Sequence, residues 1–161
     1  MTQPRTDVAT FVETCLLALW LGAALFFAAI VAPTAFDVLP TPGLAGALVG
    51  GVLPSLFVGG MVIAAVILGL ELRAPRAGGR MRATGAGVML TACVLAHFVI
   101  GGQIERIRSA SAEPIGALAR DDPRRVAFGR LHALSVGALG AAMVAAAIAA
   151  VGARGALGAR S

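Results

Sequence analysis

The chain has 161 residues, of which 58% are hydrophobic and only 13% are charged, and its formal net charge is +5. Soluble domains carry about a quarter charged residues, so this composition excludes an ordinary soluble domain. All the basic residues are arginines, and they stand mainly at the ends of apolar runs, where membrane proteins keep them. The positive charge therefore does not predict nucleic-acid binding, and no nucleic-acid partner is expected.

Four long runs of the sequence contain no charged residue. Each reaches the roughly 20 residues that a helix needs to cross a bilayer, and within lipid such runs must be helical so that the backbone polar groups are satisfied. These runs cover residues 14–36, 38–70, 83–104 and 131–153. We therefore expect an all-α fold, an integral membrane four-helix bundle that forms one transmembrane domain over 1–161. The expected spans are about 8–35, 42–72, 81–108 and 123–153.

Local signals place the ends of the first two helices. Pro33 lies in the last turn of the first span and should bend or end it. Thr41 is an expected helix cap with Pro42 at the first helical position. Pro54 removes one hydrogen bond inside the second span, so we expect a kink there.

The later loops indicate the fourth helix and the orientation. Asp122 followed by Pro123 is typical of a cap and a first helical position, and a short surface helix is expected after Glu113-Pro114. The first loop has no arginine, whereas four arginines lie close together around the second, at 73–82. This bias favours termini in the cytoplasm.

Small residues at every fourth position predict close helix packing. Helices in lipid associate through close contact and polar bonds, and such stripes allow the backbones to approach. The fourth span carries one stripe and the second span a shorter one. Their members are Ala133, Gly137, Ala141, Ala145 and Ala149, and Gly51, Ser55 and Gly59. Trp20 lies in the middle of a span and is expected to pack between helices, with its N–H bonded to a neighbour.

Three ionisable residues inside the spans are candidates for function. Glu13 lies in the first turns of the first span, where it can pair with Arg154 on the same side of the membrane. His97 and His132 fall in the same half of the bilayer, with His97 deeper. The favoured role of His97 is a hydrogen bond across the bundle, to Ser135 or to a backbone carbonyl.

A metal or haem site is the alternative interpretation of the histidines. Neutral imidazole is a common ligand, so His97 and His132 are the candidate cofactor-binding residues. Cys93 is one helical turn from His97, which makes Cys93 and His97 the candidate metal ligands. Closed soft-metal sites usually need three or four ligands, and the sequence offers no CxxC-type pair. We therefore favour a protein without a cofactor.

Several segments resemble the family of transmembrane protein 205 and its bacterial relatives, a domain of unknown function. The quoted likenesses are "LALWLGAALFFAAIVAPTAFDVLP", "GLAGALVGGVLPSLFVGG", "QIERIR" and above all "FGRLHALS", which supplies Phe128, Arg130, Leu131, His132 and Ser135. The resemblance covers roughly residues 15–150 and implies a four-helix integral membrane protein without an agreed reaction. Leu139 departs from the family pattern, which has asparagine there. A distant similarity to copper-resistance membrane proteins keeps a metal role open.

The sequence-based hypothesis is a small membrane protein without enzymatic activity. Helix-packing signals are abundant and buried polar groups are few, which favours a structural or accessory subunit that contacts lipids and other integral membrane proteins in a larger complex. The alternative is a metal-, haem- or proton-linked role in transport or resistance, centred on His97 and His132. Small-molecule efflux is a third interpretation, and it requires a polar cavity between the helices.

Overall fold

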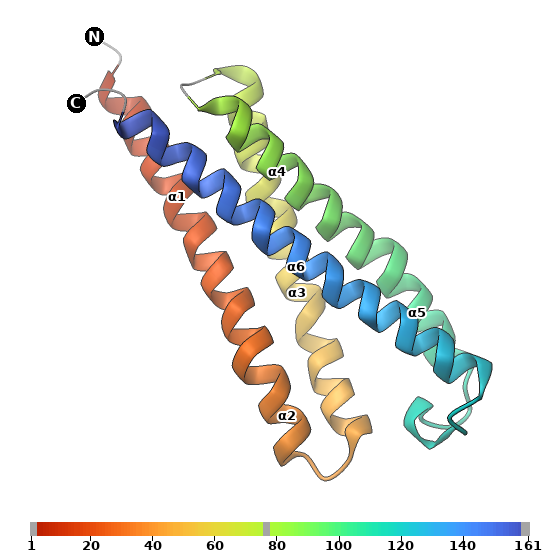
Figure 1. The fold of residues 1–161 in the computed structure, drawn as a ribbon. Helices are drawn as coiled ribbons and strands as arrows, with labels where there is room; N and C mark the ends of the chain where they lie inside the picture. The colour runs from red at the N-terminus through yellow and green to blue at the C-terminus, as the bar shows by residue number, and fades with distance from the viewer. Residues whose placement is uncertain (1–2, 76–77, 159–161) are drawn as a thin grey trace.

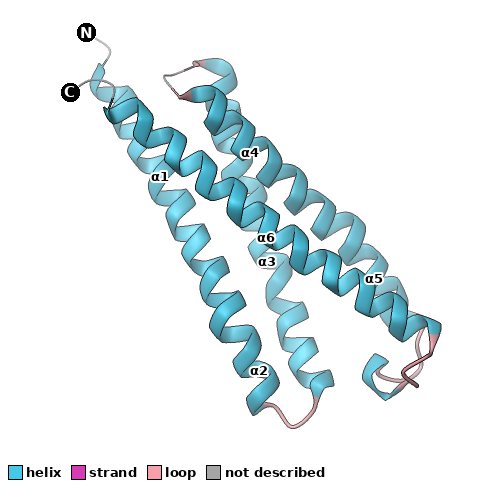
Figure 2. Cartoon of the chain, in the orientation of Figure 1, coloured by secondary structure: helices cyan, strands magenta, loops and turns pink. Residues whose placement is uncertain are grey.

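A computed structural model describes residues 3–75 and 78–158, with side chains described for 8–75 and 78–152. Helices account for nearly all of the described residues, and no strand occurs among them (Figures 1 and 2). Two of the long helices contain a π-helical segment, η1 and η2, which divides them. The elements are α1 (Gln3–Phe26), η1 (Phe27–Val31), α2 (Ala32–Val38), α3 (Pro42–Arg73), α4 (Gly79–Val94), η2 (Leu95–Ile100), α5 (Gly101–Ser109), η3 (Ile115–Ala117) and α6 (Pro123–Gly158).

Four helical segments are long and apolar enough to cross a membrane. They cover Val8–Val38, Pro42–Arg73, Gly79–Ser109 and Pro123–Gly152. Large apolar side chains stand on their outer faces, among them Leu19 and Leu72, which are 72% and 73% exposed. An apolar surface of this extent is typical of a protein that contacts lipid. The predicted fold class, an all-α membrane four-helix bundle, is confirmed.

The helix starts agree with the sequence signals. The Thr41 hydroxyl accepts a hydrogen bond from the Leu44 N–H at 3.3 Å, and Pro42 opens α3. At the start of α6, an Asp122 carboxylate oxygen accepts the Arg124 N–H at 2.8 Å. Hydrogen bonds from Arg124 lower the pKa of Asp122 below its ordinary value, so this cap stays charged at neutral pH.

The first membrane segment continues past Pro33 instead of ending there. The Ala32 N–H bonds back to the Phe27 carbonyl, five residues earlier, which is the widened turn of a π-helix. This widened turn immediately precedes the proline and gives its ring space in the helix. The segment ends at Val38, where Leu39 becomes extended. After Pro114 only a single 3-10 turn forms, Ile115–Ala117.

The four long segments form a ring in which each contacts its neighbours in the chain and the first contacts the last. The α4–α6 contact is the most extensive, followed by α3–α4, α1–α6 and α1–α3. Gly85 lies at the α4–α6 crossing, where an added Cβ would be 2.7 Å from the Ala145 carbonyl oxygen and 2.9 Å from the Ala149 Cβ. The backbones approach this closely only because Gly85 has no side chain.

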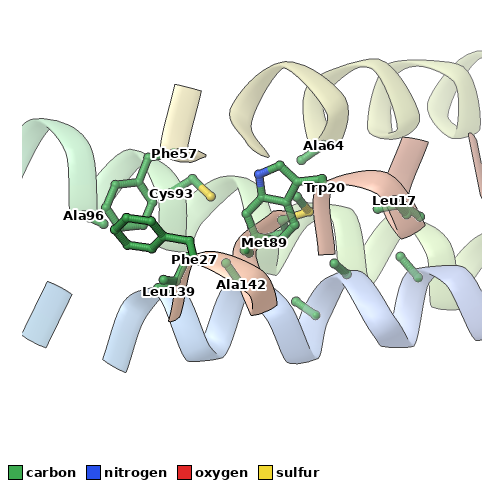
Figure 3. Close-up of a cluster of buried hydrophobic side chains, with 14 of the residues drawn as sticks. Leu17, Trp20, Phe27, Phe57, Ala64, Met89, Cys93, Ala96, Leu139 and Ala142 are labelled. Carbon is green, nitrogen blue, oxygen red and sulfur yellow. The ribbon is translucent and has the colours of Figure 1, made fainter. Parts of the chain in front are cut away.

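The interior between the four segments holds a chain of buried apolar side chains (Figure 3). Trp20 is 5% exposed and its Nε1–H donates to the Leu56 carbonyl oxygen at 2.8 Å. The prediction for this tryptophan is therefore confirmed. Gly60 on α3 makes room for the indole, since a Cβ there would lie 3.0 Å from Trp20 Cζ2 and 2.8 Å from Cys93 Sγ.

The small-residue stripes lie only partly in the interior. On α6, Ala145 and Ala149 are buried, but Ala133, Gly137 and Ala141 are exposed. On α3, Gly51 and Ser55 are exposed and Gly59 is half-buried. Close contacts are also made by glycines outside the predicted stripes, among them Gly60, and Gly85, which meets the stripe residues Ala145 and Ala149. Alanine and glycine are so frequent in these helices that spacing alone does not select the packed face.

The crossing at Gly85 generates a stability prediction. Gly85→Ala should destabilise the protein by about 1–3 kcal/mol, because the new Cβ overlaps the α6 backbone. Gly87→Ala is the matched control, since nothing lies within 4 Å of a Cβ at that position on the same helix. The control should be neutral or more stable by up to about 1 kcal/mol, the helix-propensity gain of alanine. Thermal unfolding of both variants in the same detergent measures the difference, and equal midpoints would contradict the assignment.

Candidate functional site

A cavity of about 1060 Å³ lies at the end of the bundle opposite the two termini. Its walls come from five parts of the chain. They are Phe36 on α2, residues 42–57 of α3, residues 96–108 of η2 and α5, residues 111–116 of the following connection, and residues 125–135 of α6. The bundle is therefore not closely packed at this end, but the cavity is only partly polar, whereas the efflux interpretation requires a polar one.

The cavity wall changes from charged to apolar along its length. Glu105, Arg108, Glu113 and Arg125 line it near the helix ends, where α5 finishes and α6 begins. Along α3 the lining continues to Phe57, which is 15 residues from Pro42 and so about 22 Å further along the helix. Phe57 is 3% exposed and belongs to the apolar cluster of Figure 3. The cavity thus has a polar end and a hydrocarbon-like end.

Both predicted histidines line this cavity. His97 comes from η2, and His132 comes from α6, where its ring stacks parallel to Phe128 with 6.3 Å between centroids. Ser135 also lines the cavity and is buried. The His97 ring contacts the edge of its neighbour Phe98. No hydrogen bond joins His97 to Ser135 among the described side chains, so their common feature is the cavity.

The "FGRLHALS" motif divides into two faces. Phe128, His132 and Ser135 follow helical spacing and line the cavity, whereas Arg130 is exposed and stands outside its wall. One face of the first turns of α6 therefore contributes to the cavity. The other face is presented to the surroundings of the protein.

Cys93 and His97 have different surroundings. Cys93 is fully buried against Trp20 and Gly60 in the apolar cluster, and the cavity wall includes His97 but not Cys93. Within the described residues, no group of three His, Cys, Asp or Glu side chains is placed to hold a metal ion. The predicted metal site at Cys93 and His97, and the predicted cofactor site at His97 and His132, stay predictions.

Arg108 joins three sides of the cavity. From α5, its Nη2 atom reaches the Gly46 carbonyl oxygen on α3 at 3.5 Å. Its guanidinium carbon lies 5.4 Å from the centre of the Phe128 ring on α6, within the range of a cation–π interaction. Arg125, at the start of α6, donates to the Leu118 carbonyl oxygen. Sequence reasoning assigned no role to either arginine.

At the other end of the bundle, an ion pair is buried beside the turn between α3 and α4. Arg82 Nη2 lies 2.7 Å from Glu71 Oε1, and both side chains are at most 2% exposed. Arg82 Nη1 also lies 3.4 Å from the Thr10 hydroxyl on α1. Gly79 and Gly152 leave the space for these two side chains, since an added Cβ would press on Glu71 or Arg82 respectively.

Sequence reasoning missed this ion pair and placed Arg82 in a basic turn. A signal was present: Glu71 is two residues before the end of α3 and Arg82 three residues after the start of α4, so the two face each other across a helical hairpin. Glu13, one turn beyond Thr10 on α1, is also buried. The Arg154 side chain, its predicted partner, lies outside the described residues.

The ion pair predicts opposite outcomes for single and double substitution. Arg82→Met should cost about 3–5 kcal/mol, because it removes the cation that lies 2.7 Å from the buried Glu71 carboxylate. Glu71→Met combined with Arg82→Met should recover part of that loss, since two apolar side chains of similar size replace both charges. Thermal unfolding in detergent gives the measurement, and Arg80→Met, an exposed site two residues away, is the control. If the double variant unfolds at a lower temperature than Arg82→Met alone, the prediction is contradicted.

The sequence family described as a domain of unknown function, DUF4149, matches residues 15–113, which is more than half of the chain. The chain therefore belongs to this family. No curated protein and no solved structure matches the chain. The matched residues include α3, η2 and α5, which form much of the cavity wall, and both members of the buried ion pair. They stop before the "FGRLHALS" motif, so the narrower likeness to transmembrane protein 205 is not confirmed.

Proposed function

We propose that this protein is a membrane-embedded binding protein, without catalytic activity, whose cavity holds an amphipathic small molecule. The observation that supports the proposal is the cavity of about 1060 Å³ with charged residues at one end and apolar residues at the other. Its volume is slightly above the range typical of small-molecule sites, about 300–1,000 Å³. An amphipathic molecule matches both ends of such a wall.

Local structure at the cavity also supports a binding role. The π-helical segment η2 carries two lining residues, Ala96 and His97, and π-turns within α-helices occur frequently at functional sites. Two polar side chains from α6, His132 and Ser135, face the same space. Ligand sites usually have a mostly apolar wall with a few polar groups in defined positions, as this cavity does.

The proposal includes a membrane and an orientation. We place both termini in the cytoplasm, because the arginine-rich turn between α3 and α4 lies on the side of the termini. The bacterial inner membrane is proposed from the resemblance to bacterial relatives of transmembrane protein 205. The cavity then lies in the outer half of the bilayer. A relationship to the transmembrane protein 205 family is part of the proposal, and the motif at 128–135 supports it.

Filling the cavity tests the binding role. Gly46 lines the cavity and nothing lies within 4 Å of a Cβ there, so Gly46→Leu adds a side chain without a clash at Cβ. The protein in a neutral detergent should retain at least one of oleate, oleyl phosphate or oleyl alcohol in native mass spectrometry. Gly46→Leu should lower this retention several-fold, because the ligand and the new side chain compete for space.

Gly51→Leu is the matched control for the filled cavity. Gly51 is on the same helix, is exposed, has open space at Cβ and is outside the cavity wall. This variant should retain the probe like the unmodified protein. If no probe binds, or if both variants bind equally well, the cavity is not a ligand site.

A second candidate function is the accessory-subunit role. The supporting observation is that Ala133, Gly137 and Ala141 form an exposed strip of small residues on the outer face of α6. Small residues let a second helix approach closely in lipid, and the strip is not used for packing within the described chain. A helix of another integral membrane protein is the partner of this proposal.

Substitution within this strip tests the accessory role. Gly137→Leu should remove a partner that co-purifies from native membranes in mild detergent, because the leucine holds the second helix away. Gly22→Leu is the control, an exposed glycine on α1 with the same open space at Cβ. Recovery of the unmodified protein alone, with no partner to lose, would exclude this second role.

A further inference from the structure

We infer that the molecule in the cavity carries an anionic head group, a phosphate or a carboxylate on a hydrocarbon chain, and that Arg108 recognises this head group. The inference rests on the proposed function and adds the chemical class of the ligand. It assigns Arg108 a role that neither the sequence pattern nor the family match supplies.

The guanidinium of Arg108 is held at the cavity by groups that do not neutralise it. Gly46 offers a backbone carbonyl at 3.5 Å and Phe128 offers the face of its ring. Gly50 adds room, since a Cβ there would lie 3.2 Å from both terminal nitrogens of the guanidinium. The Gly50 carbonyl also lacks its usual helical donor, because Pro54, four residues later, has no N–H. Neutral dipoles and a π-face thus orient the cation and leave its charge available.

The carboxylates that line the cavity do not pair with Arg108 or Arg125. Among the side chains described at 8–75 and 78–152, no carboxylate oxygen lies within 4.0 Å of either guanidinium. Glu105 and Glu113 are exposed and can stay hydrated, whereas Arg108 and Arg125 are half-buried. A partly buried cation without a counter-ion is costly, and arginine binds phosphate and carboxylate through two parallel N–H donors. An anion is therefore the better match to the polar end.

The apolar end supplies the place for the chain. Ala96, Leu53 and Phe57 line the cavity away from the helix ends. Ala96 precedes Arg108 by twelve residues along η2 and α5, which is about 18 Å of helix. A ligand with its anion at Arg108 would extend its hydrocarbon chain along this wall towards the middle of the bilayer. A hydrophilic anion would leave these apolar residues uncovered.

The experiment compares three probes that share one chain and differ in the head group: oleate, oleyl phosphate and oleyl alcohol. Each is titrated against the purified full-length protein in a neutral detergent at mildly alkaline pH, and bound probe is measured by native mass spectrometry. At least one anionic probe should bind about tenfold or more tightly than oleyl alcohol, because hydrogen bonds to a charged head group are stronger than neutral ones. Whichever of oleate and oleyl phosphate binds better indicates whether the source is a fatty acid or a phospholipid.

Variants of two arginines on α5 assign the effect to one residue. Arg108→Gln should remove most of the preference for the anion while oleyl alcohol still binds, which also shows that the variant is folded. Arg108→Lys should restore part of the preference through its charge. Arg106→Gln is the control. Arg106 lies two residues before Arg108, is exposed and is outside the cavity wall, so removing its charge should leave the preference for the anion unchanged.

The outcomes separate this inference from the proposed function. Equal binding of all three probes, or loss of the preference in Arg106→Gln and Arg108→Gln alike, would overturn the inference and leave the binding cavity in place. Failure of every probe to bind the unmodified protein would overturn the proposed function itself. An anion preference that disappears only in Arg108→Gln supports both.

Discussion

The closeness of helix backbones, set by where glycine occurs, is the constraint on which the rest of this structure depends. In lipid no hydrophobic force draws apolar helices together, so packing distance decides where they associate. Near the termini, a Cβ added at Gly78 or Gly85 would overlap backbone atoms of α6, and one at Gly79 or Gly152 would press on neighbouring side chains. At the other end, glycines such as Gly46 have open space. The bundle is therefore closed at one end and hollow at the other.

The buried ion pair reinforces this asymmetry. Arg82 and Glu71 join α4 to α3 across their turn, and the Thr10 hydroxyl extends the polar contact to α1. Charges are tolerated there because each has a partner and because the neighbouring glycines let the helices enclose them. Such polar contacts between membrane helices are modest in energy but fix which faces meet. The closed end thus specifies the helix arrangement, and the hollow end is free to differ in shape and chemistry.

The features that the sequence predicted are those with a local cause. The Thr41 cap, the start of α6 after Asp122 and the hydrogen-bonded Trp20 each depend on one residue type in a recognisable setting. The packed faces of the helices have no such local cause. Small residues recur around the whole of α6, and only the contact with α4 determines that Ala145 and Ala149 are the buried ones. Both histidines were placed in the same half of the bilayer, but the cavity that they share requires five segments of the chain to meet.

Cys93 and His97 lie on either side of the point where the α-helix changes to the π-helical segment η2. In a regular α-helix, residues four apart lie nearly above one another, which is why a shared site was expected. The Gly101 N–H bonds to the Ala96 carbonyl, five residues back, so η2 contains one residue more per turn. One extra residue rotates the side chains that follow by about 100° relative to a regular helix. Cys93 precedes this segment and lies in the apolar cluster, while His97 lies within it and lines the cavity. The π-helical segment thus begins where the lining of the cavity begins on this helix, at Ala96 and His97.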